Sequence, residues 1–248
     1  MLATVATTPT CHPELVEGSR RKSFDLLKAR LPQSVSVASS RRAAALSFEV
    51  LLPTAIPALD RLLGGGFPSG VVATLEGETG RWSLAAGLVA RMTRRSLVAI
   101  LDDGGLYPPA LAEAGACLER VLVVPAGKAL AMARAADILL RSRICRLVLM
   151  PAVALRDAVW ERLAKLAHRS GVLLIVVAAR AGAALSAVAG MRLHCALERV
   201  LMHGQRGLWG TVAGFEIRVD VRKHKHMAAG GSARVRVECE EMRDAALR

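Results

Sequence analysis

Aromatic residues are scarce in this sequence: they make up 3% of the 248 residues, although 53% of the chain is hydrophobic. Alanine, leucine and valine must therefore supply most of any core. A hydrophobic content this high excludes a chain that is disordered throughout. The sequence also lacks an apolar run of the about 18 residues that a membrane-spanning helix needs, since its longest run, 171–179, has the length of a strand. We therefore expect one sizeable domain with extensions and no membrane segment.

Acidic residues are outnumbered, with 21 Asp and Glu against 34 Lys and Arg, which gives a net charge of +13. A basic balance of this size favours a polyanionic partner such as nucleic acid. The alternative is an arginine-rich solvated surface without a specific partner. Composition alone does not separate these two interpretations.

Closely spaced cysteine pairs are missing as well. The five cysteines are dispersed, odd in number and free of the Cys-x-x-Cys spacing typical of zinc sites and redox motifs. This pattern indicates small core residues in a reducing compartment and argues against disulfides. Since the apolar segment of a secretory signal is also absent, we expect a cytoplasmic protein. The cysteines are Cys11, Cys117, Cys145, Cys195 and Cys239.

Short apolar runs alternate with segments of helical period through the middle of the chain. Continuous runs of Val, Ile and Leu between helices are typical of a parallel sheet that is covered on both faces. After residue 190 the pattern changes and predicts an antiparallel edge. The predicted fold class is therefore α/β. The predicted parallel strands are 71–75, 96–101, 121–124, 146–150 and 173–178.

Three parts of the chain differ in this pattern. Residues 1–40 lack the alternation and are predicted to be a disordered leader. Residues 41–230 carry it and are predicted to form the core domain. Residues 231–248 are predicted to be a final edge strand followed by a polar tail.

A glycine turn connects the first of these strands to an Ala- and Leu-rich helix. A P-loop of the form G-x-x-x-x-G-K-[ST] would hold phosphate here, but only two residues separate Gly77 from Gly80. Arg81 takes the place of the lysine and Trp82 that of the hydroxyl residue that ligates Mg²⁺, with Ser83 one position further. We interpret the turn as a degenerate nucleotide-binding loop. Trp82 is predicted to fill the vacated phosphate pocket, and the alternative is an anchor for a partner protein.

The order of these parts resembles the RecA-type ATPase core from about residue 51 to residue 227. No single match is specific, but six segments match in order and spacing. The resemblance implies a RecA-like, P-loop-type core with a mostly parallel sheet. The matching segments are 52–70 (the lead into the P-loop), 100–102 (the strand of the catalytic glutamate), 147–155 (the Walker B strand), 173–177 (the strand before the sensor pair), 192–193 (a late strand) and 221–225 (the Val-Val-Lys-Asn-Lys segment).

The residues that hydrolyse ATP in working members of that class are missing at the matching positions. Pro151 stands where an acidic residue would order Mg²⁺, and Gly104 stands where the water-activating glutamate would be. Ala178 and Ala179 replace the sensor Asn-Gln pair. Because phosphoryl transfer depends on these groups for positioning and charge stabilisation, the sequence predicts a protein that is not an enzyme and has no metal site. It predicts no required cofactor and allows weak ATP binding at the start of the helix.

A basic bacterial protein of this size, with a RecA-like core and altered ATP motifs, is similar to the ImuA family, which is sometimes labelled as SulA-related. The resemblance implies a non-catalytic accessory role in SOS-induced, error-prone translesion DNA synthesis. The implied partners are RecA, an ImuB-like relative of the Y-family polymerases and an error-prone replicative-type DNA polymerase, with DNA as a further candidate. The alternatives are a DNA-dependent ATPase or recombinase-like DNA-binding protein, and a SulA-like inhibitor of cell division.

Two groups of basic residues are candidate contact sites. Lys223 and Lys225 match lysines that in RecA contact the nucleotide of the neighbouring subunit, which makes them candidate partner contacts. The alternative for this pair is a solvated edge strand protected by its charge. Arg91, Arg94 and Arg95 lie near the end of a predicted helix, where they complement the negative end of the helix dipole. The alternative for these arginines is a DNA-facing patch.

Overall fold

The computed structural model describes residues 50–203, 211–225, 227 and 229–239. The predicted leader, 1–40, and the end of the predicted tail, 240–248, lie outside the described residues. The strands are β1 (Leu51–Leu52), β2 (Phe67–Pro68), β3 (Val72–Glu76), β4 (Val98–Asp102), β5 (Val121–Pro125), β6 (Leu147–Pro151), β7 (Leu173–Ala178), β8 (Met191–His203), β9 (Thr211–His224) and β10 (Ser232–Glu238). The helices are α2 (Pro57–Leu62), α3 (Arg81–Thr93), α4 (Pro108–Glu113), the 3-10 turn η1 (Leu118–Arg120), α5 (Ala129–Ser142), α6 (Asp157–Ser170) and α7 (Ala183–Val188).

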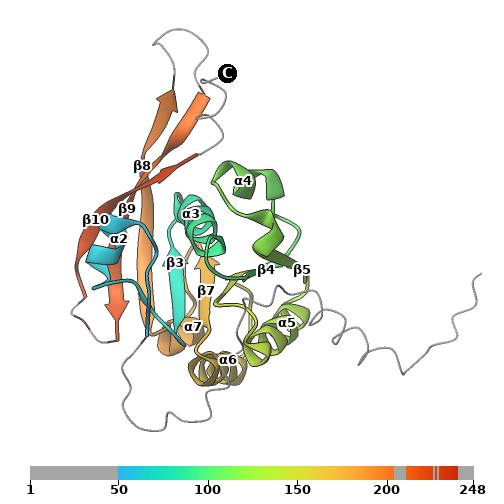
Figure 1. Ribbon diagram of the computed structural model, residues 1–248. Coiled ribbons are helices and arrows are strands. Elements are labelled where there is room, and N and C mark those ends of the chain that lie inside the picture. Colours follow the sequence, from blue (N-terminus) through green and yellow to red (C-terminus); the bar gives the residue numbers. More distant parts are fainter. Residues whose placement is uncertain (1–49, 204–210, 226, 228, 240–248) are drawn as a thin grey trace, which may run out of the picture. The chain divides into compact units, whose positions relative to one another are not determined.

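The main sheet has eight strands in the order β10-β9-β8-β3-β7-β6-β4-β5 (Figure 1). Neighbouring strands from β8 to β5 are parallel, with β3 between β7 and β8. Strands β8, β9 and β10 pair antiparallel and form one edge of the sheet. This arrangement confirms the predicted fold class, an α/β core with a mostly parallel sheet and an antiparallel edge.

Helices cover both faces of the parallel part of the sheet. Helices α2, α3 and α4 bury their apolar side chains in one cluster, and α5, α6 and α7 bury theirs in a second cluster. Along β7 the residues alternate between the two: Ile175 packs in the first cluster, and Leu174 and Val176 pack in the second. Because every residue of β6 and β7 is buried on one face or the other, these two strands have almost only apolar side chains.

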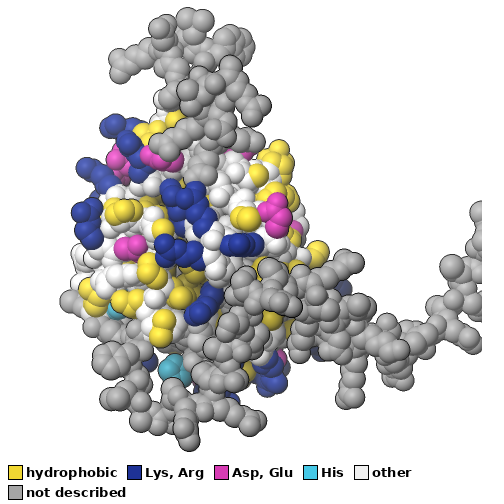
Figure 2. All heavy atoms as spheres, viewed as in Figure 1, with side chains coloured by type: hydrophobic (Ala, Val, Ile, Leu, Met, Phe, Trp, Pro, Cys, Tyr) yellow, Lys and Arg dark blue, Asp and Glu magenta, His cyan; other side chains and the backbone are white. Residues whose placement is uncertain are grey.

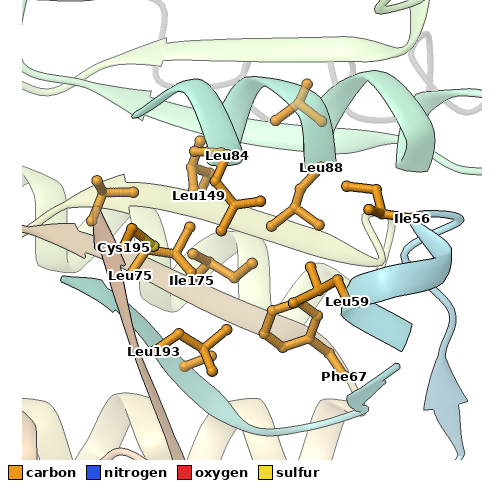
Figure 3. Packing of buried hydrophobic residues seen from close by; sticks show 14 of the residues in the cluster. Ile56, Leu59, Phe67, Leu75, Leu84, Leu88, Leu149, Ile175, Leu193 and Cys195 are labelled. Atoms are coloured by element: carbon orange, nitrogen blue, oxygen red, sulfur yellow. The ribbon is translucent and has the colours of Figure 1, made fainter. Parts of the chain in front are cut away.

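The cluster under α3 fixes the turn that joins β3 to this helix. Figure 3 shows side chains of α3 and α2 directed toward those of the central strands. Since these residues are almost completely buried, β3 and α3 are held in a defined relative position, and so is the loop between them. The labelled side chains are Ile56 at the N-terminal cap of α2, Leu59 of α2, Phe67 of β2, Leu84 and Leu88 of α3, Leu75 of β3, Leu149 of β6, Ile175 of β7, and Leu193 and Cys195 of β8.

Candidate functional site

The turn of residues 77–80, called the 77–80 loop below, follows β3 at the carboxyl end of the central strands. Its two glycines have positive backbone angles, with φ of 127° at Gly77 and 77° at Gly80. The carbonyl of Gly80 accepts the hydrogen bond from the Leu84 amide at 2.9 Å, which starts α3. In open α/β sheets ligands bind at the carboxyl ends of the strands, so the predicted loop lies where a ligand site of this fold class is expected.

The 77–80 loop is packed against the backbone of both neighbouring strands. The Gly77 amide donates to the Ala179 carbonyl, just after β7, at 3.0 Å. On the other side, a Cβ on Gly77 would lie 2.0 Å from the carbonyl oxygen of Cys195 in β8. The Leu197 amide of β8 donates to the Thr79 hydroxyl at 3.2 Å. The loop is therefore held by contacts with segments more than 100 residues away in the chain.

The Arg81 guanidinium lies against the loop that precedes it. Its Nη1 donates to the carbonyl oxygen of Gly77 and, at 2.6 Å, to that of Glu78. A phosphate-binding loop turns backbone amides toward its ligand, whereas here two carbonyl oxygens are turned toward a cation. For a phosphate to bind at this position, Arg81 would have to leave these carbonyls, and its charge would then be available to the anion.

The aromatic residue of this segment lies at the surface of the protein. Trp82 is 45% exposed. That Trp82 fills the phosphate pocket stays a prediction, and so does the alternative, an anchor for a partner protein. Ser83, one position further, is half-buried in the first turn of α3.

A buried ion pair at the base of the loop had no role in the sequence-based interpretation. Glu76, the last residue of β3, is 5% exposed. Arg192 of β8 donates from Nε to Glu76 Oε1 at 2.7 Å and from Nη2 to Oε2 at 2.9 Å. The Thr74 hydroxyl donates to Oε1 at 2.7 Å, and the Ala181 amide lies 3.4 Å from Oε2. This carboxylate therefore links β3, β8 and the segment after β7 directly beneath the 77–80 loop.

The environment of Glu76 favours its charged form. Burial acts to raise the pKa of this carboxyl, but the hydrogen bonds from Arg192, Thr74 and the Ala181 amide outweigh burial and lower the pKa below its usual value of 4.5. The sequence showed only that Glu76 directly follows a mostly apolar predicted strand; that it is buried, and therefore needs a partner, came from the structure. The partner itself, 116 residues away, could not be identified from the sequence.

The ends of the other central strands lie where the resemblance placed them. Pro151 is the last residue of β6 and is buried, and β7 ends at Ala178. At the end of β4, Asp102 Oδ1 accepts hydrogen bonds from the Gly104 amide at 3.0 Å and the Leu106 amide at 2.9 Å. The Asp102 carboxylate therefore stabilises the turn that follows its strand.

The two candidate contact lysines have different surroundings. Lys223 Nζ donates to the carbonyls of Ser186 and Ala187 in the last turn of α7, at 3.1 and 3.2 Å. This side chain therefore ties β9 to α7. Lys225, just beyond β9, has an exposed side chain. Of the pair, Lys225 is the one available to a partner.

Within the described part of the chain, no group of three His, Cys, Asp or Glu side chains lies close enough together to hold a metal ion. None of its helices has the length and apolar character needed to cross a membrane.

Comparison with known proteins identifies the fold. No family model matches the sequence, and no curated protein matches it. Among solved structures, the fold is similar to that of the RadB recombinase, with 20% sequence identity and a TM-score of 0.59. The similarity covers 75% of this chain and 96% of the RadB chain.

This similarity corrects one prediction and confirms another. The prediction that the chain is not an enzyme is wrong, because the matching structure is that of a recombinase and points to an enzyme. The absence of the motif residues was an insufficient basis for predicting that the chain is not an enzyme. Membership of the ImuA family stays a prediction. The RecA-like architecture expected from the order of the segments is confirmed: this chain has a RecA-like fold.

Proposed function

We propose that this chain serves DNA-damage tolerance as a RecA-like accessory protein in SOS-induced, error-prone translesion synthesis. It acts by contact with RecA and with an ImuB-like relative of the Y-family polymerases, and through them with an error-prone replicative-type polymerase. The similarity of its fold to a recombinase supports a role in DNA repair. The resemblance of its sequence to the ImuA family supports the specific pathway.

The observation that carries the proposal is the RecA-like strand order, β8-β3-β7-β6-β4, with β9 and Lys225 beside it. A protein with the core of a RecA subunit presents surfaces similar in shape to those by which such subunits meet. The resemblance aligns Lys225 with a lysine at such a contact. Its exposed ammonium group can therefore meet an acidic or phosphate-bearing surface of RecA.

We predict that Lys225→Glu weakens binding to RecA about tenfold or more. Reversing the charge of an interfacial cation replaces attraction with repulsion, which costs at least about 1.4 kcal/mol. The measurement is the affinity of the labelled full-length chain for RecA assembled on single-stranded DNA. The control is Lys165→Glu on α6, where the lysine makes only an exposed pair with Glu161 at 3.5 Å. Equal losses for both variants, or undiminished binding of Lys225→Glu, would contradict the proposal.

A second candidate function, that of a DNA-dependent ATPase, is favoured by the similarity to a recombinase. Arg81 is the cation at the 77–80 loop and would be the residue that meets phosphate. Phosphate release from ATP, measured with and without single-stranded DNA, tests this candidate. DNA-stimulated release that Arg81→Ala abolishes would support it. Release that is absent from the parent chain would remove it and leave the contact role.

A further inference from the structure

Arginines gather at the end of α3 that is farthest from the 77–80 loop. Arg91 lies in the last turn of the helix, Arg94 is its C-terminal cap, and Arg95 follows. Residues three and four apart share one face of a helix, so Arg91 lies beside the other two. The segment from residue 81 to residue 97 contains no aspartate or glutamate. The end of α3 is therefore a concentration of positive charge without acidic residues of its own.

The tertiary structure adds a fourth arginine to this surface. The Nη1 of Arg120, at the end of η1, donates to the carbonyls of Thr93 and Arg94 at 3.3 and 2.7 Å. The Thr93 hydroxyl accepts the Cys117 amide at 3.1 Å, which holds the segment before η1 on the helix. Arg120 thereby satisfies carbonyls at the negative end of α3. With that end already capped, Arg91 and Arg95 are not needed for this role.

The arginines near the end of α3 and those at the antiparallel edge of the sheet differ in their ion pairs. There, Arg218 pairs with Asp220 at 3.0 Å and Arg234 pairs with Glu198 at 2.7 Å. By contrast, neither Arg91 nor Arg95 has an ion-pair partner among the described residues. Arg120 does have an acidic neighbour, Glu119, whose pKa is lowered by the hydrogen bond from the Cys117 thiol at 3.0 Å and also by the charge of Arg120.

The arginine surface lies on the face of the molecule that carries α3 and is accessible to solvent. Arg94, Arg95 and Arg120 are exposed, and Arg91 is half-buried. Figure 2 shows Lys and Arg side chains gathered over the part of this face where Figure 1 draws α3. Helix α3 runs back from the carboxyl end of β3 to the start of β4. The surface is therefore at the opposite end of the sheet from the 77–80 loop.

We propose that this surface, formed by Arg91, Arg94, Arg95 and Arg120, binds the phosphate backbone of a nucleic acid. The planar guanidinium group offers paired donors that match phosphate oxygens, and a cluster of such groups attracts successive phosphates. The net charge of +13 raises the local concentration of such a partner. Contacts of this kind recognise the backbone and carry no base preference. The inference does not depend on the protein partners proposed above.

The test uses the full chain and a fluorescein-labelled oligothymidylate, with a duplex of equal length as a second probe. Fluorescence anisotropy gives the affinity over a series of salt concentrations. Each phosphate contact to a single strand contributes about 0.7 to the slope of log affinity against log salt. We expect the double variant Arg91→Gln, Arg95→Gln to bind about tenfold more weakly and to lose about 1.4 from this slope. Glutamine is a good helix former, so α3 should persist.

The matched control removes two positive charges elsewhere. Lys128→Gln with Arg134→Gln changes the exposed N-terminal cap of α5 and an exposed residue within this helix, which packs on the other face of the sheet. It should keep the slope of the parent chain, and thermal unfolding should show that both double variants are folded. Three results would overturn the proposal: no binding of either probe by the parent chain, an unchanged slope in the α3 variant, or an equal loss in the control. Duplex binding with the same dependence on Arg91 and Arg95 would support it for double-stranded DNA.

Discussion

Gly77→Ala should destabilise the folded chain by about 4 kcal/mol. The backbone at Gly77 has a φ of 127°, a conformation that costs a residue with a side chain about 1–3 kcal/mol. The new Cβ would also lie 2.0 Å from the carbonyl oxygen of Cys195, and such overpacking costs a further about 1–3 kcal/mol. Backbone atoms of β8 cannot turn aside as a flexible side chain can. Denaturant unfolding followed by circular dichroism measures the loss.

A second glycine provides the control. At Gly127 an added Cβ would have no atom within 4 Å, and its φ is not in the positive range. Gly127→Ala should therefore change the free energy of unfolding by no more than about 0.5 kcal/mol. If Gly77→Ala were equally mild, the 77–80 loop would not be packed on β8 as described.

Glu76→Gln should destabilise the chain by about 3 kcal/mol at neutral pH. The substitution preserves the size of the side chain but leaves Arg192 without its counter-charge. Removing one partner of a buried pair costs about 3–5 kcal/mol, and the lower value applies because the Arg192 side chain is 27% exposed. Glu161→Gln serves as the control, since its pair with Lys165 is exposed. Urea unfolding of the three proteins measures the difference.

The loss of stability caused by Glu76→Gln should become smaller as the pH falls. The pKa of Glu76 is lowered on folding from its ordinary 4.5, so its charged form is stabilised in the folded state. That contribution is complete above pH 4.5 and is lost as the pH falls through the folded-state pKa. The stability difference between parent and variant should therefore be constant near neutral pH and shrink in acid. A difference that grows on acidification would contradict the ion pair.

The parallel core was predictable because its signal is local. Strands such as β6 and β7 are buried on both faces, so they are continuous apolar runs that need no knowledge of their neighbours. The order of the segments then indicated the RecA-like architecture that the comparison with RadB confirms. Helix α7 was not predicted. Half of its six residues are alanine, and it lacks the helical period that longer helices show. The bulges between β8 and β9 also have no local signal.

The candidate site likewise has features that were predictable from local sequence and features that were not. Its position followed from two glycines between a strand and a helix, which is a local feature. The direction of side chains was decided by distant contacts: the turn of Arg81 into its own loop, the exposure of Trp82 and the pairing of Glu76.

By itself, the sequence determined the α/β class, the strands of the core and the place of the loop, since all three follow from hydrophobic pattern and glycine positions within short segments. Only the tertiary structure decided what surrounds that loop, because β8 reaches it from more than 100 residues away. The tertiary structure also joined Arg120 to the end of α3, 26 residues earlier in the chain. Contacts of this range arise from the packing of whole elements, and no local pattern of residues encodes them.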